Sequence, residues 1–393
     1  MSINRNINTK RFKINDFFAF FDGLDLSINL SILLYLSGFI FGSYDTRIAL
    51  IYSVSVILLS FMSRVFDIFL LKKLEKFKLQ SINIIFLLLL AYFIPILIQK
   101  SMPIFLSIFI LSISRILVGI VYSLTYRQVN LGINTLTYNI LSLKHWAIYV
   151  FGLFFGSFLY LLVNEIYSNE FLNEGGWKIF YVLMFTKLFL FFVFIKFFRK
   201  ETLTFNYDYI DSILQKQKIS LVGILLIVPL ISFYMFVSSK WLPKFSNPEN
   251  LSFLNYDSLY LFLTMLIFLF ISPLARLVGK SKSIVFFSIS IFLISTVCIF
   301  IDHSSSYSIN FLKFFISMVS AFSLCCFIIQ SELNHKNLDV TSIINNFKFM
   351  SALLLPLLQY YFIYKTLNYS VIYILLSIVY FINYINFSVK KNG

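Results

Sequence analysis

The chain has 393 residues, of which 59% are hydrophobic and 12% are charged, and its mean hydropathy of +0.87 is too high for a soluble domain to bury its apolar surface. Its apolar runs are about 20 residues long and do not alternate with polar residues, so they indicate membrane-spanning helices and argue against a transmembrane barrel. The net charge of +15 is carried between these runs, which favours a role in membrane orientation over nucleic-acid binding.

The chain starts with a polar, basic segment, MSINRNINTKRFKIN, and the apolar segment after it is too long for the core of a signal peptide. We therefore expect no cleavable signal peptide, a cytoplasmic start and a first apolar segment that is retained as a span. Hydropathy predicts about twelve spans of roughly 20 residues. Their approximate limits are 16–42, 47–71, 80–99, 103–127, 146–164, 177–198, 219–239, 257–275, 283–301, 309–331, 346–365 and 368–388.

The loops between these spans differ in charge. With the start inside, the loops on the inner side carry most of the lysines and arginines, whereas the outer loops hold only Arg47, Lys100, Lys240, Lys244 and Lys365. Basic residues collect on the cytoplasmic side of membrane proteins, so both termini are predicted to be cytoplasmic. The segment 165–176 carries three glutamates and no basic residue, which fits an external loop.

Asp22 and Asp25 lie in the first predicted span, in the stretch FFDGLD. A carboxylate near the bilayer centre costs roughly 3 kcal/mol, and positions three apart share a helix face, so this face should border a cavity and not lipid. Two carboxylates this close repel each other, so one of them can hold a proton near neutral pH. The pair is a candidate site for a proton or a substrate ammonium group. The alternative is that Asp22 is hydrated and anchors the cytoplasmic end of the helix.

Charged residues also gather near the predicted cytoplasmic end of the second span. A transporter that alternates between inward-facing and outward-facing states needs breakable contacts between its halves, so we expect this cluster to hold an inner gate shut. The alternative is that these charges only orient the chain. The candidate gating residues are Arg64, Asp67, Glu75, Lys76 and Lys78, with Arg276, Gly279 and Lys280 as their partners in the second half, and Glu332 at the inner end of the tenth span.

Arg115 lies near the middle of the fourth predicted span, where an arginine needs a partner or water. Tyr122 and Tyr126 follow on the same span, where they either supply hydroxyls and cation–π faces or simply pack. Lys187, in the sixth span, is a second candidate for binding a carboxylate, unless it snorkels to a polar neighbour.

The longest polar break, residues 199–218, divides the predicted spans into two equal groups. Each group has a basic loop after its second span, which indicates an internal duplication of the kind that transporters use. We therefore predict an N-terminal half at 1–198, a cytoplasmic linker at 199–218 and a C-terminal half at 219–393, each half with about six helices.

Short motifs recur in a fixed order along the chain. They are AFFDG around Asp22, Arg64 followed by EKFK at 75–78, RILVG at 115–119, GWKIF at 176–180 with RKET at 199–202, WLPKF at 241–245, the segment 273–282, ELNH at 332–335, Asn345 with Asn346, and Pro356. This series resembles the landmarks of the major facilitator superfamily, and within it the metabolite:proton symporters, which include proline/betaine and dicarboxylate carriers. Asp22 matches the aspartate of the family's EWYDF-type motif. The glutamine and glutamate of the family's fourth helix are missing, as are several loop glycines.

The resemblance implies an all-α integral membrane protein of about twelve helices in two six-helix halves, with both termini in the cytoplasm. It implies a secondary active transporter in the cytoplasmic (inner) membrane that moves a small polar solute by alternating access, with proton coupling. Spans one and four line the central cavity in that fold, so Asp22 or Asp25 should face Arg115 there. An anion and a cation in one pocket suit a zwitterion such as an amino acid or a betaine. The alternative is a structural ion pair that holds the N-terminal half together. The alternatives are a carrier of a dicarboxylate or another organic anion, and a non-transporting receptor or scaffold derived from a carrier.

Other chemistries lack their sequence signals. The cysteines and histidines show no metal-ligand spacing, no Gly-rich phosphate loop points to an ATP-driven pump, and no catalytic cluster indicates an enzyme acting on lipid. We therefore expect no enzymatic activity, no metal and no cofactor, with a proton gradient as the energy source. The expected partners are a small-molecule substrate and the lipid bilayer but no nucleic acid, and the chain is expected to be monomeric.

Overall fold

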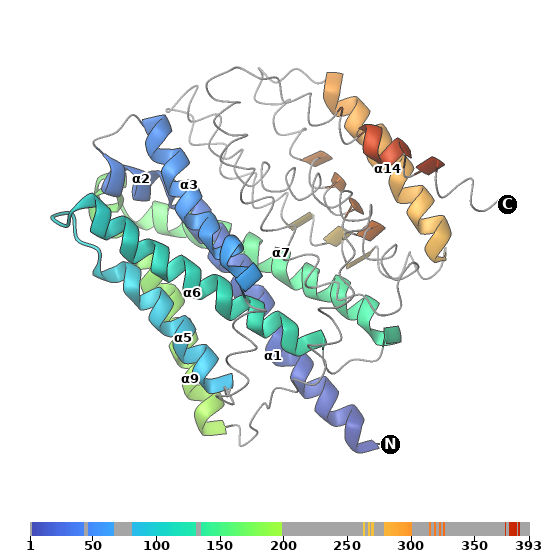
Figure 1. Ribbon diagram of the computed structural model, residues 1–393, viewed down its shortest axis with the longest axis horizontal. Coiled ribbons are helices and arrows are strands. Elements are labelled where there is room, and N and C mark those ends of the chain that lie inside the picture. The colour runs from blue at the N-terminus through green and yellow to red at the C-terminus, as the bar shows by residue number, and fades with distance from the viewer. Residues whose placement is uncertain are drawn as a thin grey trace.

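The computed structural model describes residues 2–42, 46–66, 81–130, 135–198 and 279–300, together with short pieces between residues 262 and 385. Within these residues every assigned element is helical (Figure 1). The description is most complete for the first half, whose helices agree in order with the first six predicted spans. The predicted linker and most of the C-terminal half lie outside the described residues, so the division into two halves stays a prediction.

The first predicted span, 16–42, is bent instead of straight. Helix α1 (Ser2–Ser31) continues as α2 (Leu33–Phe41), and the two parts meet at an angle of 61°. Backbone hydrogen bonds continue across the bend, from the Ile32 amide to the Ile28 carbonyl and from the Leu36 amide to the Ile32 carbonyl, each 2.9 Å long. Two backbone hydrogen bonds therefore connect α1 and α2 at the point where the span changes direction.

The next three spans follow their predicted positions. Helix α3 (Thr46–Met62) passes into a 3₁₀ turn, η1 (Ser63–Phe66). Helix α5 (Ser81–Phe93) likewise ends in a 3₁₀ turn, η3 (Ile94–Leu97), where Pro95 occupies the first turn and cannot supply a helical amide donor. Helix α6 (Ile104–Asn130) runs past Arg127, beyond the predicted limit.

Helix α7 (Thr135–Ile166) starts well before its predicted span at 146–164. It leads through α8 (Asn169–Phe171) and a π-helical turn, η4 (Leu172–Gly176), into α9 (Lys178–Phe198). The chain turns by 67° there.

Two glycines mark the starts of α9 and of α14 (Lys280–Phe300) in the second half. Gly175 has a φ of 118° and Gly279 has a φ of 89°, a backbone region that residues with a Cβ seldom adopt. Glycine at these two positions lets the chain turn sharply into the helix that follows.

The helices of the first half pack in a defined set of pairs. Helix α1 lies along α7, α3 lies on α6, and α5 packs between α6 and α9 (Figure 1). A Cβ at Gly23 of α1 would collide with the carbonyl oxygen of Tyr149, and one at Gly152 of α7 would collide with the carbonyl oxygen of Phe20. Small residues therefore let the backbones of α1 and α7 approach closely, as is usual where membrane helices associate.

Apolar side chains also cover the outer faces of these helices. Phe105 and Phe109 of α6, Phe86 of α5 and Leu190 of α9 are all exposed. Three described segments are long and apolar enough to cross a bilayer alone, Ile104–Ser123, Ala147–Ile166 and Lys282–Phe300, and the number rises to five if each of two bent pairs counts as one span. Exposed apolar faces on such helices are what lipid contact requires.

Candidate functional site

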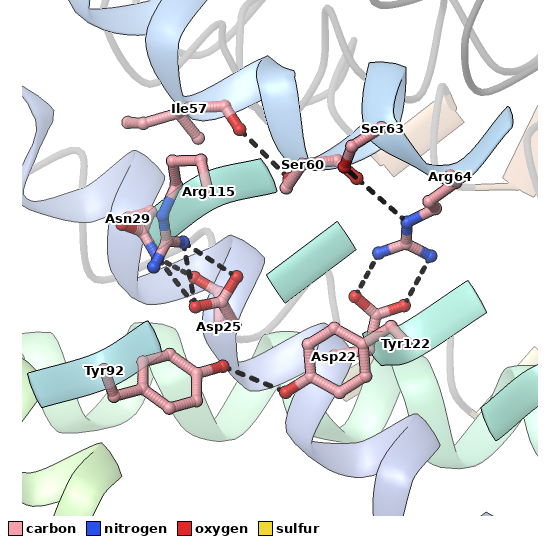
Figure 2. A network of polar contacts seen from close by, with 10 residues as sticks. All are labelled: Asp22, Asp25, Asn29, Ile57, Ser60, Ser63, Arg64, Tyr92, Arg115 and Tyr122. Atoms are coloured by element: carbon pink, nitrogen blue, oxygen red, sulfur yellow. Dashed lines mark hydrogen bonds and ion pairs between the residues drawn. The ribbon is translucent and has the colours of Figure 1, made fainter. Parts of the chain in front are cut away.

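The two aspartates of α1 bind two different arginines (Figure 2). Asp22 receives a two-pronged hydrogen bond from Arg64, with Nη2 2.5 Å from Oδ1 and Nη1 2.9 Å from Oδ2. Both side chains are buried, and Arg64 stands in the 3₁₀ turn that ends α3. A fork-to-fork contact of this kind is among the strongest charged hydrogen bonds in proteins.

The surroundings of Arg64 hold it in place on every side. Its Nε donates to the Ser60 carbonyl at 3.4 Å, and its guanidinium lies 4.8 Å from the ring centre of Phe61 and 5.9 Å from that of Tyr122. Its own backbone carbonyl accepts a hydrogen bond from Ser123 of α6 at 3.2 Å. This arginine therefore joins α1, α3 and α6 within the first half.

Arg64 is also one of the predicted gating residues. The structure gives it an ion pair with Asp22 of α1, while Asp67, with which the charge pattern groups it, lies outside the described residues, so its part in a gate stays a prediction. The other candidate gating residues do not test the gate. Gly279 is exposed at the start of α14, the side chain of Lys280 is not described, and Asp67, Glu75, Lys76, Lys78, Arg276 and Glu332 lie outside the described residues.

Asp25 pairs with Arg115 of α6, so an α1 aspartate does face this arginine as the sequence analysis expects. Nη1 of Arg115 lies 3.0 Å from Oδ1 and 3.1 Å from Oδ2 of Asp25. Asn29, one helical turn along α1, donates its amide to Oδ1 of Asp25 at 3.0 Å and to the Asp25 carbonyl at 2.7 Å. Tyr181 of α9 then donates its hydroxyl to Oδ1 of Asn29 at 2.5 Å. A chain of polar contacts thus runs from α9 through α1 to α6.

Arg115 is fully buried, but fewer of its nitrogens donate short hydrogen bonds than is the case for Arg64. Its Nη2 makes a long contact of 3.4 Å to the Ser114 hydroxyl, and within the described part of the chain its Nε has no hydrogen-bond partner. The guanidinium lies 6.0 Å from the ring centre of Tyr92 and 5.6 Å from that of Tyr181. One donor of a buried charged group therefore points at no acceptor.

Buried tyrosines surround both ion pairs. The hydroxyls of Tyr92 on α5 and Tyr122 on α6 share a hydrogen bond of 2.9 Å (Figure 2). Tyr122 is one of the predicted site residues and also lies beside Arg64, so it stands between the two pairs. Tyr92 and Tyr181 are not predicted by the sequence. The side chain of Tyr126 is not described.

Lys187 lies away from this network. It is half-buried on α9, and its Nζ lies 4.7 Å from the ring centre of Phe155 on α7. Among the described residues this lysine forms no ion pair with a carboxylate, so its role as a second anion site stays a prediction. The same residues hold no cluster of metal-ligating side chains, and Cys298, Cys325 and Cys326 are buried free thiols.

No protein-family model matches the chain, and no curated protein matches its sequence. Solved structures do match its fold. One is the proton:xylose symporter XylE of the major facilitator superfamily, bound to 6-bromo-6-deoxy-D-glucose, which is 10% identical over 96% of this chain and 95% of that one, with a TM-score of 0.63. Another is the human organic anion transporter MFSD10 (TETRAN), which is 12% identical over 96% of this chain and 99% of that one, with a TM-score of 0.57.

At these identities the likeness is one of fold. The fold of the chain is similar to that of these major facilitator transporters, and the described part of the chain is all-helical and holds several helices that are long and apolar enough to cross a membrane. The count of about twelve helices, the cytoplasmic termini and the resemblance to the metabolite:proton symporters stay predictions.

Proposed function

We propose that the chain is a secondary active transporter that moves a small polar solute, an amino acid or a betaine-like zwitterion, across the cytoplasmic (inner) membrane by alternating access, coupled to protons. It acts as a monomer, without enzymatic activity and without a cofactor other than the proton gradient. The observation that carries this proposal is the buried pair of Asp25 and Arg115, which joins α1 to α6 inside an apolar helix bundle.

Charged side chains that are buried among apolar membrane helices usually have a function. Ionisable side chains within membrane helices are rare, are expensive to insert, and mark substrate or ion pathways more often than they mark stability. The Asp22 pair and the Asp25 pair share this cost, but they differ in how their arginines are used. Arg64 has both its terminal nitrogens and its Nε engaged, whereas the Nε of Arg115 has no partner among the residues that the structure describes. The Asp25 pair is therefore the better candidate for the transport site.

A zwitterion matches the groups at this site. Its carboxylate suits the guanidinium of Arg115, and its ammonium suits the carboxylate of Asp25. The rings of Tyr92 and Tyr181, which already lie beside the guanidinium, offer aromatic faces to a quaternary ammonium group. Both charges of a zwitterion thus find a group of opposite charge at this one pair.

Proton coupling follows from the same pair. A proton on Asp25 removes its negative charge and weakens its hold on Arg115, so protonation and solute binding are linked. One proton moving inward at 100 mV supplies about 2.3 kcal/mol, which supports roughly fifty-fold accumulation of the solute.

An organic anion is the second candidate substrate. When Asp25 is protonated, Arg115 offers a positive charge with all its donors available, which suits a dicarboxylate or another anion. A solved structure of similar fold is described as an organic anion transporter. The third reading, a receptor or scaffold derived from a carrier, is separated from both by a transport assay.

The test is uptake of labelled L-proline, glycine betaine, L-glutamine and succinate into liposomes that contain the purified chain, with and without an inward proton gradient. We expect uptake of a zwitterion, stimulated by the gradient, and its loss in Asp25→Asn and Arg115→Gln at unchanged protein content. Uptake of succinate alone would favour the anion carrier. Wild-type rates in both variants, or no uptake of any compound by the wild type, would refute the assignment.

A further inference from the structure

We infer that the carboxylate of the transported solute binds side-on to Arg115, through Nε and Nη2, while Asp25 stays bound to Nη1. This inference rests on the proposed function and goes beyond it, because it names the part of the solute that is recognised and the edge that recognises it. It also differs from a simple exchange of partners, in which the solute would have to displace Asp25 first.

The geometry of a guanidinium group allows it to bind a carboxylate in two ways. Its five N–H bonds lie in one plane and form two edges that each fit a carboxylate with parallel hydrogen bonds, an end-on edge between Nη1 and Nη2 and a side-on edge between Nε and Nη2. Asp25 uses neither edge fully, because both its oxygens contact the same nitrogen, Nη1. The side-on edge of Arg115 therefore keeps its capacity to bind a second carboxylate.

The contacts of the side-on edge support this assignment. Nη2 reaches the Ser114 hydroxyl only at 3.4 Å, and that hydroxyl already donates to the Ala91 carbonyl at 2.7 Å. Nε is buried and has no acceptor among the described residues. Leaving a donor of a charged group buried without an acceptor costs more than the roughly 1–3 kcal/mol of a neutral one, so such groups are retained where they have a task.

Arg64 provides an internal comparison. It is as deeply buried as Arg115 and also pairs with an α1 aspartate, but its end-on edge is filled by both oxygens of Asp22, and its Nε donates to the Ser60 carbonyl. The same residue type in the same bundle thus has its Nε and its end-on edge occupied at one position and an Nε without an acceptor among the described residues at the other. The difference lies in local geometry and not in burial or charge.

The surroundings of Asp25 keep Nη1 occupied while the solute binds. Asn29 fixes Oδ1 of Asp25, and Tyr181 fixes Asn29 from α9, so the carboxylate is held on one side of the guanidinium. Because Asp25 and Arg115 together are neutral, a bound carboxylate brings one excess negative charge into a low-dielectric site. That charge has to enter with a positive partner, which is the ammonium of a zwitterion or a proton on Asp25. The side-on edge therefore explains why one site suits both a zwitterion and an organic anion.

The test compares each carboxylate with a relative that lacks it, in liposomes that contain the full chain. The pairs are L-proline with L-prolinamide, glycine betaine with choline, and succinate with succinamide, each offered as a competitor of whichever labelled carboxylate the wild type takes up. A charged bidentate contact is worth roughly tenfold to a hundredfold in affinity, so we expect the carboxylate of the matching pair to compete better by that factor. In Arg115→Lys the positive charge remains but the side-on edge is lost, so the gap within the pair should shrink at least tenfold.

Arg64→Lys is the matched control, because it makes the same change in an arginine whose Nε and end-on edge are already occupied by groups of the protein. We expect it to weaken both members of a pair alike and to leave the gap unchanged. If Arg115→Lys does not fold, as judged by its elution and melting temperature in detergent, the wild type still decides. The ¹⁵N-labelled arginine Nε–H signals should include one that shifts with the carboxylate that the wild type takes up, for example L-proline, and not with the matching compound that lacks it, for example L-prolinamide.

The outcomes separate the two proposals. No uptake of any compound refutes the transporter assignment and the inference together. Three results refute the side-on site while the transporter assignment stands. They are uptake in which the compound without a carboxylate competes as well as its partner, a gap that survives Arg115→Lys, and an Nε–H spectrum that is unchanged by the carboxylate that the wild type takes up.

Discussion

Asp22 and Asp25 are three residues apart on one helix, and each meets an arginine from a different helix. Three residues advance a helix by about 4.5 Å and turn it to within about 60° of the starting direction, so the two side chains leave the same face at different heights and angles. Asp22 reaches the end of α3 and Asp25 reaches the middle of α6. One helix face therefore carries two ion pairs side by side. In one, the Nε of the arginine also donates a hydrogen bond, and in the other it has no acceptor among the described residues.

The Asp22–Arg64 pair should act mainly through folding. We expect Asp22→Asn and Arg64→Gln each to lower the free energy of unfolding by about 3–5 kcal/mol, because either change leaves a buried charge without its partner. The double variant leaves no such charge, so its loss should be smaller than the sum of the two. Unfolding of all four proteins in detergent gives the coupling in a double-mutant cycle. Strictly additive losses would show that the two residues do not depend on each other.

Among the residues of the candidate site, the sequence predicts the two aspartates and Arg115 but not all the side chains that contact them. A charge inside an apolar run is visible in the sequence, which is why both aspartates and Arg115 stand out. Asn29 was also detectable, because it follows Asp25 by four residues and so shares its face. Tyr92 and Tyr181 were not, because nothing local distinguishes them among 24 tyrosines. Only the packing of α5 and α9 brings them to the pair.

The helix pair α1 and α7 is in close contact at three glycines. Gly23 of α1 and Gly152 and Gly156 of α7 lie where an added Cβ would strike the backbone or a side chain of the other helix. Because the backbone of α1 carries both aspartates, its distance from α7 helps to set where their carboxylates lie. The glycines are thus part of what positions the site.

The contact between α1 and α7 can be tested with a glycine of α7, and a glycine of α2, which continues α1, serves as the control. We expect Gly152→Leu to lower the melting temperature in detergent strongly, because overpacking a tight contact costs about 1–3 kcal/mol or more and here the obstacle is backbone. Gly38→Leu in α2 should change stability little, since no atom lies within 4 Å of an added Cβ there. Equal melting temperatures for Gly152→Leu and the wild type would mean that α1 and α7 are not in this close register.

Helix existence was easier to predict than helix geometry. The apolar runs give the order and approximate position of each described helix, because the bilayer requires about 20 apolar residues per span. They miss the early start of α7 at Thr135, since the polar stretch TLTYNILSLKH is helical without being apolar. They also miss the bend after Ser31, where neither proline nor glycine marks the break. Hydropathy reports where lipid lies, and not where a helix begins or bends.

In the whole molecule α7 has two roles. It packs along α1 on one side, and its Phe154 ring lies 5.5 Å from the ring centre of Phe262, in the eighth predicted span. Alternating access moves one half of a transporter against the other around a fixed site. If the chain transports by alternating access as proposed, α7 would couple that motion to the site, because it contacts both the charged helix α1 and a residue of the predicted second half.

The orientation of the whole chain in the membrane is predicted by loop charge and can be tested with single cysteines. The three native cysteines are buried, so they should give little background. We expect Asn173→Cys, at an exposed position in the acidic segment between α7 and α9, to react in intact cells with a maleimide that cannot cross the membrane, because that segment is predicted to be external. Lys216→Cys, in the predicted linker, should react only with a permeant maleimide or after lysis. The permeant reagent labels both variants and so controls for expression and for local reactivity. Labelling of the linker cysteine from outside, with protection of the cysteine at 173, would invert the predicted orientation and would place the basic loops on the outer face.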